Sequence, residues 1–237
     1  MRPTTIAMTA VLLALTACSS DDSASGYRDA ARMAVRNAVL TLDDLPDAWA
    51  VSSIGEESYT NIQLTGDCAR LNGRGAGFPG EVATANSEPF SGPLGQELVS
   101  TVTGFADPDA AAAAVSAADT LVLNCTSQIN EALKQAIGIA AEDRNVGGLI
   151  GDINTSVEPD ATFPAFGDQS LAYRLSADFS AFFQRFDVNG HIIAVRDGPL
   201  AAVLVYAALG DQSADEEQAI AARLTEKLTQ AAASLPD

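Results

Sequence analysis

Positive charge is scarce in this sequence. Its 237 residues include 31 Asp and Glu but only 13 Lys and Arg, and the formal net charge is −18. Nucleic acids are bound mainly through Lys and Arg side chains that neutralise phosphates, so this composition excludes a nucleic-acid partner. The same imbalance argues against an electrostatic attraction between the domain and anionic lipids.

Histidine is almost absent, which restricts the chemistry that the chain can perform. The single histidine, His191, directly follows Asn189-Gly190, a pair that favours a tight β-hairpin turn. One histidine is too few for a histidine-based metal centre, and an exposed turn position does not suit a catalytic base. The Gly-x-Ser-x-Gly signature of many serine hydrolases is also missing. We therefore predict a binding protein that has no catalytic residues, no metal ligands and no cofactor.

Two stretches carry only part of a known ligand-binding motif. Residues 72–77 contain the glycines of a phosphate loop but lack its Gly-Lys-Ser/Thr ending. Residues 152–156 begin like a calcium loop, but Val157 stands where that loop needs Gly and Phe163 where it needs Glu. We interpret both matches as accidental.

A hydrolase remains the alternative from a different functional class. An enzyme that uses two carboxylates would place two acidic side chains opposite each other in one cleft. The candidates are Asp152, Asp168, Asp178 and Asp187. A structure that leaves these four side chains scattered and solvated would remove this alternative.

Long apolar runs are missing as well. The run from Ile6 to Leu15 is shorter than the roughly 20 residues that a transmembrane helix needs, and no later segment reaches that length. It follows Arg2 and ends in Leu15-Thr16-Ala17-Cys18, a pattern typical of a bacterial lipobox. The pattern predicts a signal peptide over residues 1–17 that is removed from the mature protein.

Cys18 is then the first residue of the mature chain and the expected site of lipidation, with acyl chains such as palmitate. Two or more acyl chains anchor a protein stably to a membrane. The polar residues that follow predict a flexible tether over residues 18–26 and argue against a buried thiol at Cys18. We expect the protein on the extracytoplasmic face of the cell membrane.

The two remaining cysteines, Cys68 and Cys125, form an even pair in an oxidising compartment. A disulfide between them would stabilise the fold by about 4 kcal/mol in the chain-entropy treatment. Two separate buried thiols remain the alternative.

The order of expected elements predicts an α+β fold, with an antiparallel β-sheet packed against helices in a single domain over residues 27–237. Hydrophobic periodicity and turn signals place the helices and strands. Helices are expected at residues 27–40, 108–123, 127–140 (where a strand is the alternative) and from 213 onward. Strands are expected around residues 59–64 and at 81–86, 96–105, 146–157, 170–177, 181–189, 191–196 and 200–209.

Several short motifs, together with the lipobox and the cysteine pair, resemble a known group. They are Leu45-Pro46-Asp47-Ala48-Trp49, Val102-Thr103-Gly104-Phe105-Ala106-Asp107, Phe166-Gly167-Asp168-Gln169-Ser170 and Val195-Arg196-Asp197-Gly198. The chain resembles actinobacterial extracytoplasmic lipoproteins and receptor-kinase sensor domains of the PknH-like extracellular domain family. Those sensor domains hold a second disulfide, and their receptors also have a transmembrane helix and a kinase domain. None of these three features occurs in this sequence.

The resemblance implies a sensor-like domain that binds a ligand in a cleft between sheet and helices, without assigning ligand-binding residues. We expect a small envelope-derived molecule in such a cleft. A protein partner at the cell surface is the alternative, and it would need a contiguous exposed apolar patch.

Overall fold

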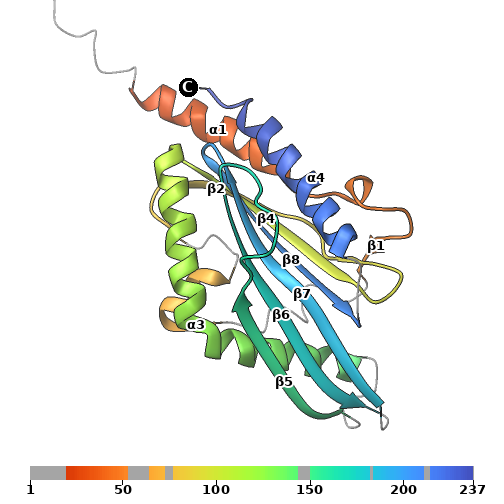
Figure 1. Ribbon diagram of the computed structural model, residues 1–237. Coiled ribbons are helices and arrows are strands. Elements are labelled where there is room, and N and C mark those ends of the chain that lie inside the picture. The colour runs from red at the N-terminus through yellow and green to blue at the C-terminus, as the bar shows by residue number, and fades with distance from the viewer. Residues whose placement is uncertain are drawn as a thin grey trace, which may run out of the picture.

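An antiparallel sheet lies between two layers of helix (Figure 1). The computed structural model describes residues 20–52, 64–72, 77–143, 150–181, 184–210 and 214–236. All strand pairs of the eight-stranded sheet are antiparallel, so the predicted α+β class and the single domain are confirmed. No helix within these ranges is both long enough and apolar enough to cross a membrane.

The helical elements are α1 (Ser20–Ala38), η1 (Leu42–Asp44), η2 (Gly66–Leu71), α3 (Pro108–Asp143) and α4 (Ala214–Ala232). The strands are β1 (Ala50–Val51), β2 (Glu81–Asn86), β3 (Phe90–Ser91), β4 (Glu97–Phe105), β5 (Ile150–Pro159), β6 (Gln169–Ala181), β7 (Gln184–Asp197) and β8 (Leu200–Leu209). They are ordered β1-β3-β4-β8-β7-β6-β5, and β2 also pairs with β4.

One face of the sheet packs against α1 and α4, which lie side by side (Figure 1). Alternate residues of β8 are buried on this face, as expected for a strand in the middle of a sheet. They are Leu200, Ala202, Leu204, Tyr206 and Ala208. The apolar stripe of α4 faces them and is buried throughout: Ile220, Leu224, Leu228 and Ala231. Each fully buried leucine stabilises this core by about 2 kcal/mol.

The opposite face is covered in part by α3 and η2. The side chain of Asp107 caps the start of α3, because its Oδ1 accepts a hydrogen bond from the Ala110 backbone N–H at 2.7 Å. Cys68 on η2 and Cys125 on α3 form the expected disulfide, with Cα atoms 5.8 Å apart. The bridge therefore joins the loop-rich first half of the chain to the long helix.

β7 differs from the prediction in one important respect. Two strands joined by a turn at Asn189-Gly190 were expected, but β7 runs without interruption from Gln184 to Asp197. Gly190 pairs with Leu175 on one side and Ala207 on the other. A β-carbon at position 190 would lie 1.9 Å from the backbone oxygen of Tyr206, so only glycine fits this close contact between strands. The glycine serves strand packing rather than a turn.

A turn does occur further along, at Asp197-Gly198. It connects β7 to β8, and Gly198 adopts a left-handed backbone conformation with φ of +53°.

The helices also differ from their predicted bounds. Residues 20–26, predicted as part of a flexible tether, already belong to α1. The two helices predicted at 108–123 and 127–140 form one continuous helix, α3, so the strand alternative for 127–140 is wrong. The strand expected around residues 59–64 and the start of the one at 146–157 fall largely outside the described residues.

Replacing Gly190 with alanine tests the close contact between β7 and β8. We expect Gly190→Ala to reduce the free energy of unfolding by more than about 2 kcal/mol, because backbone atoms must move to admit the methyl group. Urea unfolding measures this change. Gly26→Ala is the matched control, because no atom lies within 4 Å of a β-carbon there and alanine is the better helix former. A tolerated Gly190→Ala would contradict the packing described for this strand.

Candidate functional site

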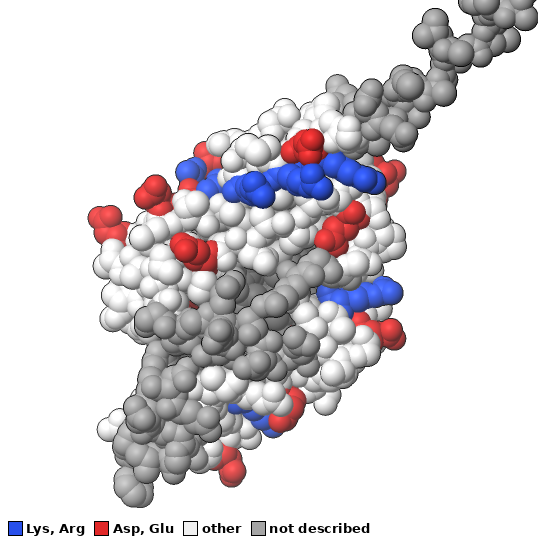
Figure 2. Space-filling model, turned by 180° about the vertical axis from the view of Figure 1, so that it is seen from behind, with Lys and Arg blue, Asp and Glu red and all other residues white. Residues whose placement is uncertain are grey.

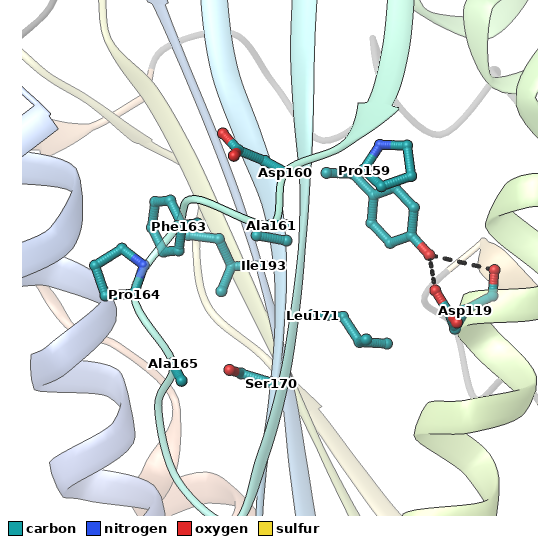
Figure 3. A pocket seen from close by; sticks show the side chains of 12 residues that line it. Asp119, Pro159, Asp160, Ala161, Phe163, Pro164, Ala165, Ser170, Leu171 and Ile193 are labelled. Atoms are coloured by element: carbon teal, nitrogen blue, oxygen red, sulfur yellow. Dashed lines mark hydrogen bonds between the residues drawn. The ribbon is translucent and has the colours of Figure 1, made fainter.

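A pocket of about 350 Å³ opens where β5 separates from β6 (Figure 3). Strand pairing ends at Pro159 and Tyr173, with one further hydrogen bond from the Asp160 N–H to the Ala172 carbonyl at 2.8 Å. The chain then leaves the sheet and returns at Gln169, the start of β6. We call residues 160–168 the pocket loop. The pocket lies at the edge of β6, where it is lined by this loop, by β6, by Ile193 of β7 and by Asp119 of α3.

The pocket is lined mostly by apolar side chains. They are Pro159, Ala161, Phe163, Pro164, Ala165, Leu171, Ala172 and Ile193. Polar atoms come from Asp119, Asp160, Ser170 and Tyr173. A few polar groups in an apolar concavity are the usual composition of a small-molecule site.

Two local interactions give the pocket loop its shape. The carboxylate of Asp160 accepts hydrogen bonds from the backbone N–H and the hydroxyl of Thr162, at 2.9 and 2.5 Å. At the other end, the Phe166 N–H donates to the Ser170 hydroxyl oxygen at 3.0 Å. Phe163 and Phe166, with ring centroids 6.1 Å apart, pack against the core beneath α4. The loop is therefore held at both ends and by its aromatic side chains.

Tyr173 and Asp119 form the polar corner of the pocket. The Tyr173 hydroxyl donates a short hydrogen bond to the Asp119 carboxylate, and it also lies 3.3 Å from the Asp119 carbonyl oxygen (Figure 3). Burial raises the pKa of Tyr173, and the neighbouring Asp119 raises it further. The phenol thus stays protonated at neutral pH, and Asp119 is already engaged as its acceptor.

Behind the pocket, His191 lies between two carboxylates. Its Nδ1 is 2.9 Å from Glu217 of α4 and its Nε2 is 3.2 Å from Asp160 of the pocket loop. The side chains of His191, Glu217 and Asp160 are only 15%, 7% and 6% exposed. The Phe163 ring lies against the imidazole, with centroids 4.8 Å apart. We call His191, Asp160 and Glu217 the buried ion cluster.

The buried ion cluster favours a charged imidazole. Burial by itself would lower the pKa of His191, but the hydrogen bonds and negative charges of Glu217 and Asp160 outweigh it and raise the pKa. Hydrogen bonds from Thr162, His191 and Arg174 hold the pKa of Asp160 well below its usual range, although burial opposes them. Both imidazole nitrogens therefore donate hydrogen bonds, and neither is available to act as a base.

The position predicted for His191 is thus wrong. An exposed hairpin was expected, but the residue lies within β7, opposite Tyr206 of β8. The cluster joins three elements that are far apart in sequence: the pocket loop, the sheet and α4. We interpret the buried ion cluster as a link between these elements that fixes the position of the pocket loop.

The four carboxylates proposed for a hydrolase do not form a site. Asp152 and Asp168 are exposed, and Asp168 forms an ion pair with Arg196 and accepts a hydrogen bond from the Gly198 N–H. Asp178 and Asp187 lie opposite each other on β6 and β7, but on a solvated surface where Arg185 contacts both, at 3.2 and 3.6 Å. The carboxylates that do line the pocket, Asp119 and Asp160, carry no distinguishing sequence pattern.

The two partial motifs are not ligand loops within the described residues. Residues 152–157 are part of the extended strand β5, whose geometry does not wrap around a calcium ion. In the other motif, Asn72 uses its side chain to bind the backbone of Leu64 at 2.9 and 3.0 Å, and residues 73–76 lie outside the described ranges. Across the described ranges, no group of three or more His, Cys, Asp or Glu is placed to hold a metal ion.

Comparison with known proteins gives a likeness in fold. No protein-family model matches the sequence, and no curated protein matches it. Among solved structures, the crystal structure of the extracellular domain of PknH from Mycobacterium tuberculosis is similar, with a TM-score of 0.45 and 11% sequence identity. The similarity covers 84% of this chain and 97% of that domain. No residue of the pocket is assigned from it.

The buried ion cluster predicts a specific dependence of stability on pH. A raised histidine pKa contributes stability that is fully present below pH 6.5, the ordinary value, and is lost as the pH rises through the raised pKa. We expect His191→Gln to cost about 3 kcal/mol at pH 6, because the buried Glu217 loses its cation and Asp160 is left with the exposed Arg174. The cost should shrink by pH 9. Urea unfolding at both pH values measures it.

The pH dependence of this variant can be assigned to one imidazole, because His191 is the only histidine in the sequence. At acid pH, the lowered pKa of Asp160 has its own effect on stability. Its contribution is fully present above pH 3.8, the ordinary value, and is lost as the pH falls through the lowered pKa of the folded state. The two measurements at pH 6 and pH 9 avoid that range. An equal cost of His191→Gln at both pH values would show that the imidazole is not held in its charged form.

Proposed function

We propose that this protein is a lipid-anchored extracytoplasmic binding protein whose pocket holds a small envelope-derived molecule. The observation that carries the proposal is the pocket at the edge of β6, which is lined by eight apolar residues and by the polar side chains of Asp119, Asp160, Ser170 and Tyr173. Its volume of about 350 Å³ lies at the lower end of the range for small-molecule sites. The ligand is therefore small, or only part of a larger molecule enters.

The lining limits the chemistry of that ligand. Two carboxylates, Asp119 and Asp160, border the pocket. The two cations that contact Asp160 among the described residues, Arg174 and His191, are already engaged in ion pairs with it. An anionic ligand would meet negative charge in a protein that is acidic overall. A neutral or cationic molecule with an apolar body and one hydrogen-bonding group fits best, and the Ser170 hydroxyl is placed to donate to it.

Binding without catalysis follows from the same contacts. Tyr173 is held protonated by Asp119, and Asp160 is occupied by Thr162, His191 and Arg174. A general acid or base needs a proton position that is open to substrate. The ionisable groups at this pocket instead form hydrogen bonds and ion pairs with each other.

A protein partner is the second candidate, and the exposed apolar residues support it less. Five of them are scattered over separate parts of the chain: Met33, Leu42, Val51, Leu94 and Leu123. The other two, Val99 and Val203, are near neighbours on the adjacent strands β4 and β8. Scattered exposed apolar residues are normal on a monomer surface.

The anchor is supported by the lipobox and by the disulfide, which suits an oxidising compartment. In a bacterium that processes lipoproteins, we expect the intact mass to correspond to residues 18–237 plus acyl groups. Cys18→Ala should abolish both cleavage and acylation, whereas the neighbouring change Ser19→Ala should leave both intact. A mature chain that begins elsewhere or lacks acyl groups would refute the anchor.

The pocket is tested by filling it. Ala165 lines the pocket on the exposed pocket loop, so Ala165→Trp should obstruct binding without disturbing the core. Native mass spectrometry of protein from its own envelope should detect a bound small molecule in the wild type, and at least about tenfold less in Ala165→Trp.

Ala106→Trp is the matched control, because Ala106 is also exposed but does not line the pocket. Equal occupancy in Ala165→Trp and Ala106→Trp would refute the pocket as the site. A co-purified protein without any small molecule would favour the second candidate instead.

A further inference from the structure

Three arginines form a row along α1. Arg28, Arg32 and Arg36 follow each other at four-residue intervals, which places them on one side of a helix. All three are exposed. Figure 2 shows a row of basic side chains across the upper part of the molecule, where α1 runs. In a chain with a net charge of −18, three of the 13 basic residues therefore gather on one helix face.

The row is exposed beside the buried face of α1. That buried face carries Ala31, Ala34, Val35 and Ala38, which pack against the sheet and α4. Among the described residues, Arg28 and Arg36 take part in no ion pair, and Arg32 has only the exposed Asp29, at 2.8 Å. Exposed pairs of this kind contribute little and leave the charge largely available. Met33, which is 57% exposed, adds an apolar side chain to the same surface. We call Arg28, Arg32, Met33 and Arg36 the arginine face.

We infer that the arginine face lies on the anionic membrane surface to which Cys18 is anchored. This inference rests on the proposed lipid anchor. The helix begins two residues after Cys18, so its exposed side is held close to the lipid headgroups. Each arginine near an anionic leaflet favours the bound orientation by about fivefold. Such a weak attraction suffices, because the anchor makes contact intramolecular and supplies a high effective concentration.

The acidic character of the whole chain does not oppose this orientation. At physiological salt, charges are screened beyond about 8 Å, so the charges on the contact face decide the interaction. The net charge alone predicts no electrostatic attraction to anionic lipids, but it sums the charges of all surfaces of the molecule. The arginine face on α1 differs from that sum because its exposed charges are mostly positive. With α1 on the membrane, α3 lies on the far side of the sheet and faces away from it.

Fluorescence quenching in reconstituted vesicles tests this orientation. The full lipidated chain carries a dye on Met33→Cys or on Leu123→Cys, which lies on α3 and is 51% exposed. No other thiol is free, because Cys68 and Cys125 are bridged and Cys18 carries the lipid. One set of vesicles contains phosphatidylglycerol and the other contains phosphatidylcholine in its place. Both sets include a lipid with a nitroxide on its headgroup as the quencher. We expect at least threefold stronger quenching at position 33 than at 123 with phosphatidylglycerol, and a ratio near one with phosphatidylcholine or in 0.5 M KCl.

Charge variants identify the arginines as the cause. R28Q/R32Q/R36Q should bring the ratio near one in phosphatidylglycerol vesicles, whereas R70Q/K134Q/R185Q, which removes equal charge elsewhere, should leave it unchanged. Flotation of the protein with the vesicles reports the anchor separately. Protein that does not float refutes the anchor and the orientation together. Protein that floats but shows equal quenching at both positions, or quenching that ignores the arginine variant, refutes the arginine face alone.

Discussion

The architecture depends on the close passage of β7 beside β8 at Gly190. A side chain at this position would overlap the backbone of Tyr206, so the strand runs straight through only because glycine occupies it. The continuous strand then carries His191 to a position opposite Tyr206, within reach of α4 on one side and the pocket loop on the other. A turn at this point would have placed the histidine at the edge of the sheet, without its two carboxylate partners.

The buried ion cluster links the sheet to α4 and to the pocket loop. Burying charges is unfavourable unless each is paired and hydrogen-bonded, and here one imidazolium satisfies two carboxylates that would otherwise repel each other. Because Asp160 also shapes the turn at Thr162, the cluster determines where the pocket loop leaves the sheet. The pocket is thus a consequence of a strand that ends early and a loop that is held in place by charge.

Charge is distributed unevenly over the molecule, and this distribution is more informative than its sum. The net charge of −18 argues against partners that need a broadly basic surface. It does not describe the exposed side of α1, where helical periodicity aligns Arg28, Arg32 and Arg36. A tethered domain presents one face at a time to its membrane, so the local charge governs its orientation.

The sequence by itself determined the features that depend on local pattern. The α+β class, the bounds of β2 and β8 and the pairing of Cys68 with Cys125 were all predicted, because periodicity, turn residues and cysteine count are properties of neighbouring residues or of composition. Only the tertiary structure decided the role of Gly190 and the surroundings of His191. An Asn-Gly pair favours a turn, but glycine is equally required where two backbones meet, and the strand that approaches it is not encoded nearby. Asp160 and Glu217 lie 31 and 26 residues from His191, and packing of the sheet against α4 brings them together.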